Sequence, residues 1–77
     1  MAIKIYTTPT CSHCNAAKKY FRENRISFTE YNVARDMRRA DEMVKKSGQM
    51  GVPVIDVNGK VIVGFNRPEL ERALKRA

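Results

Sequence analysis

The sequence of 77 residues contains no tryptophan, only three phenylalanines and three tyrosines, and no long apolar run. A membrane-spanning helix needs about 20 predominantly apolar residues, whereas charged residues interrupt every segment of this chain. The first residues also lack the basic region, the apolar stretch and the cleavage site of a secretory signal. We therefore expect a cytoplasmic protein that does not enter a membrane.

Cysteine is equally scarce, and its two copies are too close together to form a structural framework. A disulfide between Cys11 and Cys14 would close a very small loop and would restrict the unfolded chain very little. A chain of this length can build one compact core, and it contains no repeat, linker or low-complexity segment. We predict a single domain over residues 1–77.

Acidic residues are also few, because 8 Asp and Glu stand against 15 Lys and Arg, which gives a formal net charge of +7. This excess raises the hypothesis of a nucleic-acid-binding module, whose affinity would fall steeply with salt. The basic residues are dispersed, however, mostly on the predicted solvent-facing sides of helices. We interpret them as groups that keep the protein hydrated and attract acidic partners, and we do not expect nucleic acid as a partner.

Apolar spacing and turn residues predict an α/β protein. Alternating apolar residues indicate strands, and recurrence at i, i+3 and i+7 indicates helices. Asn58-Gly59 suits the tight turn of an antiparallel hairpin, and a strand-helix-strand crossover pairs its strands in parallel. We therefore predict a four-stranded mixed sheet with helices on both faces. The expected elements are a strand at 2–6, a helix at 12–24, a strand at 27–33, a helix from the cap Asp36 to Gly48, strands at 54–57 and 60–63, and a helix capped by Asn66 with Glu69.

The second and third predicted helices each carry an apolar stripe that indicates a buried face. In the second helix the stripe consists of Met37, Ala40 and Val44, and we expect Met37 and Met43 to fill the core. In the third helix the stripe consists of Leu70, Ala73, Leu74 and Ala77.

The two cysteines lie where the first helix begins. A thiolate is the attacking species in disulfide exchange, and an ordinary cysteine with a pKa of about 8.5 is mostly protonated. The free N–H groups and the positive dipole end of a helix N-terminus favour an anion, so we expect the amides of His13 and Cys14 to point at the Cys11 sulfur. Cys14 lies almost one turn later and can reach that sulfur. The pair predicts a thioredoxin-like redox motif in which Cys11 attacks and Cys14 resolves.

A metal site is the main alternative for the pair. A closed zinc site needs four ligands, and His13, between the cysteines, is the only histidine in the chain. We therefore expect no metal ligand within one chain, although a cluster shared between two chains stays an alternative. We interpret His13 as a solvent-facing spacer in preference to a general base.

Three segments resemble glutaredoxins in their order and spacing, namely TTPTCSHC at 7–14, SGQMGVP at 47–53 and NGKVIVGF at 58–65. The resemblance extends over essentially the whole chain. It implies a thioredoxin-like fold that reduces protein or glutathione mixed disulfides, with glutathione as co-substrate and no tightly bound cofactor. We expect the chain to act as a monomer. The resemblance also implies a cis proline at Val52-Pro53 whose backbone pairs with glutathione or substrate, and further glutathione contacts at Gln49, Gly64, Phe65 and Asn66.

Other features resemble a special group within this family. Thr8 stands where glutaredoxins commonly have a lysine, and Val63 replaces one of two late glycines. The segment GFNRP at 64–68 resembles the loop of the glutaredoxin-like hydrogen donors of ribonucleotide reductase, which take electrons from thioredoxin reductase. The tryptophan that usually precedes the motif in thioredoxins is absent. The electron source is therefore open between glutathione and thioredoxin reductase.

Overall fold

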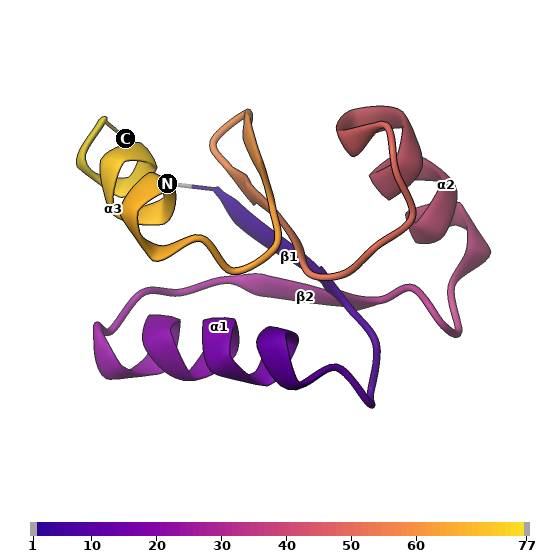
Figure 1. Cartoon of the computed structure of the whole chain (residues 1–77), viewed down its shortest axis with the longest axis horizontal. Helices are drawn as coiled ribbons and strands as arrows, with labels where there is room; N and C mark the ends of the chain where they lie inside the picture. Colours follow the sequence, from indigo (N-terminus) through magenta and orange to yellow (C-terminus); the bar gives the residue numbers. More distant parts are fainter. Residues whose placement is uncertain (1, 77) are drawn as a thin grey trace.

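The computed structural model describes residues 2–76. Its strands and helices follow the predicted order (Figure 1). They are β1 (Ile3–Thr7), α1 (Ser12–Glu23), β2 (Thr29–Asn32), α2 (Met37–Ser47), β3 (Val54–Val57), β4 (Lys60–Val63) and α3 (Arg67–Arg76). None of the helices in this described part of the chain is long and apolar enough to cross a membrane.

The strands form one mixed sheet in the order β2-β1-β3-β4. β1 pairs in parallel with β2, and the register places Ile5 opposite Glu30. β1 and β3 are antiparallel, as are β3 and β4. The predicted four-stranded mixed sheet is confirmed, and it follows from a crossover through α1 and a tight hairpin at Asn58 and Gly59, both of which have a positive φ.

Helices cover both faces of the sheet, as predicted. On one face, Ile5 and Ile55 pack with Phe21 of α1 and Leu70 of α3 in the larger apolar cluster. Residues that alternate along a strand point to opposite faces, so the neighbouring strand residues pack against α2 in a smaller cluster. Its buried members are Tyr6, Met43 and Val54.

The apolar stripe predicted for α2 is partly wrong. Met43 is buried with 2% of its surface exposed, but Met37 is 80% exposed and Val44 is 36% exposed. The physical reason is that α2 faces the sheet with Met43 and with charged side chains, so the rest of its apolar stripe is turned partly to solvent. The stripe predicted for α3 is confirmed at Leu70, Ala73 and Leu74, and Ala77 lies outside the described residues.

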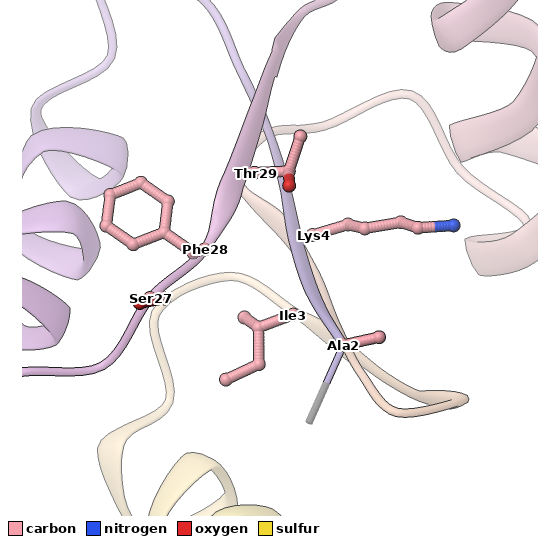
Figure 2. Close-up of a pocket in the computed structure, with 6 residues that line it drawn as sticks. All are labelled: Ala2, Ile3, Lys4, Ser27, Phe28 and Thr29. Carbon is pink, nitrogen blue, oxygen red and sulfur yellow. The ribbon is translucent and has the colours of Figure 1, made fainter.

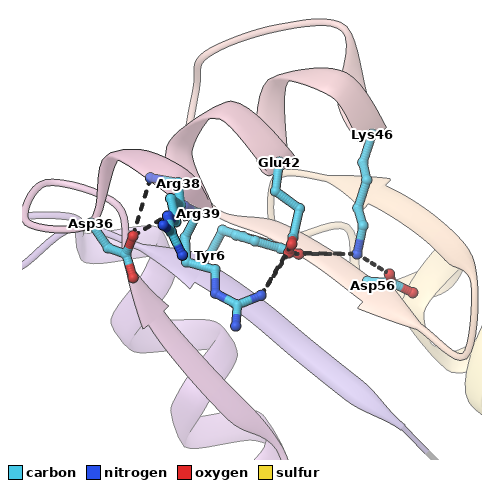
Figure 3. Close-up of polar contacts among 7 residues, drawn as sticks. All are labelled: Tyr6, Asp36, Arg38, Arg39, Glu42, Lys46 and Asp56. Atoms are coloured by element: carbon cyan, nitrogen blue, oxygen red, sulfur yellow. Dashed lines mark hydrogen bonds and ion pairs between the residues drawn. The ribbon is translucent and has the colours of Figure 1, made fainter.

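A polar network joins α2 to the sheet (Figure 3). The buried hydroxyl of Tyr6 donates a hydrogen bond to Glu42 and accepts one of 3.0 Å from Lys46 Nζ. Lys46 also lies 2.8 Å from Asp56 Oδ2, while Asp56 Oδ1 accepts the N–H of Gly59 at 2.7 Å. Lys46 therefore connects a buried tyrosine of β1 with a nearly buried carboxylate of β3.

This network predicts a loss of stability in acid. Burial alone would raise the pKa of Asp56, but the hydrogen bonds from Lys46 and Gly59 hold it below its ordinary value. The pKa of Glu42 is also lowered, mainly by its bond from Tyr6. Carboxylates with a lowered folded-state pKa stabilise the protein above their unfolded pKa and lose that contribution as pH falls through the folded value. We expect the free energy of unfolding in urea to fall between about pH 5 and pH 2, and equal values across that range would contradict this.

The end of α2 directs the chain toward the cysteines. Gly48 has a φ of 75° at the C-cap, and its N–H bonds to Val44 O at 2.7 Å. Glycine adopts this left-handed conformation without the steric cost of a Cβ. The chain then turns into residues 49–53, which come to lie beside the first turn of α1.

Candidate active site

Cys11 is the N-cap of α1. Its Sγ accepts a hydrogen bond of 3.1 Å from the backbone N–H of Cys14. An N-cap side chain accepts from the second or third helical residue, and Cys14 is the third. The predicted donation from Cys14 is therefore confirmed, whereas no bond from His13 to this sulfur is found among residues 2–76. His13 itself is exposed.

The two sulfurs have different surroundings. Both cysteines are free thiols, Cys11 partly exposed and Cys14 buried with 0% of its surface accessible. Burial, followed by the hydrogen bond with Cys11, raises the pKa of Cys14 to about 12. Cys14 is therefore held as a neutral thiol in the reduced protein.

A cis peptide bond joins Val52 to Pro53, as the resemblance implies. The Cys11 thiol donates to the Val52 carbonyl oxygen across 3.8 Å. Pro53 is buried immediately before β3, and Val52 is half-buried. Segments 41 residues apart in the sequence thus meet at the partly exposed Cys11 thiol.

The Gln49 side chain is bonded within its own loop. Its Nε2 donates to Gly51 O at 3.1 Å and to Ser47 Oγ at 3.2 Å, and its Oε1 accepts the Gly51 N–H. The Ser47 hydroxyl in turn donates to Met43 O at 2.7 Å. The amide of Gln49 therefore stabilises the loop that leads to Val52.

The segment Gly64 to Asn66 lies next to the proline. The N–H of Gly64 donates to Pro53 O at 2.8 Å, and Gly64 has a φ of 79°. Phe65 packs on Tyr20 with ring centroids 6.0 Å apart. Asn66 Oδ1 accepts the N–H of Glu69 at 3.2 Å and so caps α3, as predicted.

The structure thus brings Cys11, Cys14, Val52, Pro53 and Gly64 into one connected group. Phe65 and Asn66 follow directly, while the Gln49 side chain is directed to its own loop. The roles of these residues in binding stay predictions. Among residues 2–76, no group of three or more His, Cys, Asp or Glu side chains is arranged to hold a metal ion.

A separate hollow of about 190 Å³ lies near the beginning of β1 (Figure 2). The cysteines follow the other end of that strand. Figure 2 shows the Lys4 side chain and the Phe28 ring directed away from one another. The lining residues are Ala2, Ile3, Lys4, Ser27, Phe28 and Thr29.

One arrangement beside Cys14 was not predicted from the sequence. Lys18 Nζ lies 2.9 Å from Glu30 Oε2, and that same oxygen accepts the Thr7 hydroxyl at 2.7 Å. The spacing of four residues between Cys14 and Lys18 was the available signal, since residues i and i+4 share a helix face. The position of Glu30 next to Lys18 depends on how β2 is aligned with β1, which the spacing of residues along the helix does not predict.

A thioredoxin-like fold with a Cys-x-x-Cys pair at the N-terminus of α1 defines a class of redox proteins that exchange thiols and disulfides. The Glutaredoxin family model matches residues 3–62. The chain belongs to the glutaredoxin family, whose members are thiol-disulfide oxidoreductases.

Three relatives illustrate this membership. The chain is 46% identical over 74 residues to an uncharacterized glutaredoxin-like 8.6 kDa protein in the rubredoxin operon of Clostridium pasteurianum, covering 96% of this chain and 99% of that one. It is 34% identical over 62 residues to glutaredoxin 3 of Escherichia coli, covering 80% and 75%. The glutaredoxin-like NrdH-redoxin of Escherichia coli superposes with a TM-score of 0.80 at 29% identity, covering 94% and 93%.

Proposed function

We propose that this chain reduces disulfides of partner proteins, and glutathione mixed disulfides, through a dithiol cycle of Cys11 and Cys14. Deprotonated Cys11 attacks one sulfur of the substrate disulfide and expels the other as a thiolate, which takes up a proton. Cys14 then loses its proton and attacks the Cys11 sulfur, which releases the second substrate thiol. The substrate gains two electrons, and the cysteines lose them as they form a disulfide.

The contrast between the two sulfurs carries this proposal. Cys11 is accessible and accepts a backbone N–H at a helix N-terminus, an environment that favours an anion. Cys14 is buried, and its raised pKa keeps it protonated until Cys11 has reacted. The cycle needs no tightly bound cofactor, and the chain acts as one domain of residues 1–77 and as a monomer.

For the electron source, we propose a protein reductase of the thioredoxin reductase type in preference to glutathione. Two groups expected to contact glutathione already have partners within the chain, namely the Gln49 side chain and the Gly64 N–H. Thr8 also stands in place of the common lysine. The similarity to NrdH-redoxin, whose structure is described as the basis of a thioredoxin-like activity profile, supports the same source.

One experiment tests both the activity and its electron source. The oxidised chain is supplied with NADPH and thioredoxin reductase in one arm, and with NADPH, glutathione and glutathione reductase in the other. We expect NADPH consumption in the presence of a disulfide substrate to be several-fold faster in the first arm.

The outcomes separate the two parts of the proposal. Fast turnover in the glutathione arm alone would contradict the proposed source and leave the oxidoreductase standing. If neither arm turns over and the chemically reduced chain also fails to reduce the disulfide, the proposed function is wrong.

A further inference from the structure

Lys18 lies on the same face of α1 as Cys14, four residues further along the helix. Long helical side chains point back toward the helix N-terminus, so the Lys18 side chain extends over the turn that contains Cys14. The Lys18 side chain is only 17% exposed, and its ammonium lies 2.9 Å from Glu30 Oε2. A lysine on a solvent-facing helix surface usually keeps its charged end in water, so this position is distinctive.

Glu30 holds the ammonium in place from the neighbouring strand. The carboxylate accepts the hydroxyl of Thr7 at 2.7 Å, and Thr7 is 1% exposed at the end of β1. The hydrogen bonds from Lys18 and Thr7 lower the pKa of Glu30, so it stays ionised at neutral pH. The lysine is thereby confined between α1 and β2, and Figure 1 shows these two elements running alongside one another.

The proposed cycle requires a negative charge on the buried Cys14. In the reduced protein, burial and then Cys11 raise the pKa of Cys14, while a backbone hydrogen bond from Thr8 and the charge of Lys18 lower it. Once Cys11 is bonded to a substrate sulfur, its thiol proton and its charge are gone. The Thr8 backbone and Lys18 are then the groups that oppose the cost of burial.

Two side chains are among the groups with the largest effect on the pKa of Cys14. They are Cys11, the N-cap of α1, and Lys18 within α1. From β2, Glu30 faces Lys18, and Arg22 acts on Glu30 from the next turn of α1. Lys18 is therefore the formal positive charge with the largest effect on the pKa of Cys14.

We propose that Lys18, oriented by Glu30 and Thr7, is a positioning residue that stabilises the Cys14 thiolate while it resolves the mixed disulfide. The inference rests on the proposed dithiol cycle. In this step Cys14 gives its proton to water, its sulfur bonds to Cys11, the bond between Cys11 and the substrate breaks, and the departing thiolate takes up a proton. The ammonium of Lys18 keeps its own protons throughout.

The test separates the two steps of the cycle in one assay. An excess of reduced protein is mixed with dithiobis-nitrobenzoate, which releases one coloured thiolate when Cys11 attacks and a second when Cys14 displaces the adduct. Stopped-flow absorbance then gives both rates as a function of pH. The variants are Lys18→Met, Lys18→Arg and the matched control Lys19→Met, which removes the same charge from an exposed neighbour.

In Lys18→Met we expect the second release to slow about tenfold below the pKa of Cys14, because one pKa unit is a factor of ten in thiolate. The pH dependence of that release should move to higher pH, while the first release stays as in Lys19→Met. Lys18→Arg keeps the charge and should restore the second release.

Two results would overturn the inference alone, and a third would contradict the dithiol cycle on which it rests. If Lys18→Met and Lys19→Met have the same second release across the pH range, Lys18 does not act on Cys14. If Lys18→Met slows both releases equally, the change disturbs the site as a whole and the inference is again wrong. If the unaltered protein gives no second release, the proposed cycle itself fails.

Discussion

Replacement of Cys11 by serine is expected to abolish dithiol turnover. A serine hydroxyl is not deprotonated near neutral pH and cannot form a mixed disulfide. Cys14 cannot substitute for it, because burial leaves none of its surface accessible and raises its pKa. NADPH consumption in the coupled reductase assay should fall to the rate without the protein.

The matching variant at the second cysteine should behave differently. Cys14→Ser leaves Cys11 at its N-cap with the same backbone donor, so the attack proceeds, but no thiol remains to resolve the adduct. Mass spectrometry of the intact protein should find a stable mixed disulfide on Cys11. His13→Ala is the control, since this exposed spacer should retain turnover close to that of the unaltered protein. Full dithiol turnover by Cys11→Ser would remove the proposed mechanism from consideration.

The largest expected effect on stability comes from Lys46→Met. The change keeps much of the apolar stem but removes an ammonium that contacts Tyr6 at 3.0 Å and Asp56 at 2.8 Å. The Asp56 carboxylate, at 8% exposure, would then lack its charged partner. Hydrogen bonds to charged groups contribute about 1.5–3 kcal/mol each, and an unpartnered buried charge is costly. We expect a loss of roughly 2–4 kcal/mol in the free energy of unfolding.

A loss of that size is a large part of the total. Domains are stable by roughly 0.05–0.15 kcal/mol per residue, which is about 4–12 kcal/mol for a chain of this length. Urea unfolding followed by circular dichroism measures the change. Lys45→Met is the matched control, because it removes the same charge from an exposed neighbour and should cost under about 0.5 kcal/mol. Equal stability of the two variants would show that the network does not hold α2 to the sheet.

Features that depend on near neighbours in the chain could be predicted closely. Asn58-Gly59 adopts the turn that its two positive φ angles require, and the flanking strands form the expected hairpin. Asp36 and Asn66 cap α2 and α3 through their own side chains. Cys11 caps α1 and receives the N–H of Cys14 for the same reason, since both residues belong to one helical turn.

Features that depend on how helices and loops pack against the sheet could not be predicted in the same way. Asp56 lies in an apolar strand segment, and nothing local indicates that Lys46 would reach it. Met37 matched a helical stripe, yet it is exposed because α2 faces the sheet with Met43 and with charged side chains. The bonds of the Gln49 amide to Ser47 and Gly51 could not be predicted either, and its contact with glutathione stays a prediction.

The sequence by itself determined the order of strands and helices, the turn of the hairpin, and a thiol placed at a helix N-terminus. These follow from backbone preferences and contacts within a few residues. Only the tertiary structure decided that Glu30 restrains Lys18 beside Cys14 and that Lys46 joins Tyr6 to Asp56. Those contacts arise from packing between segments that are distant in the sequence, so no local pattern of residues predicts them.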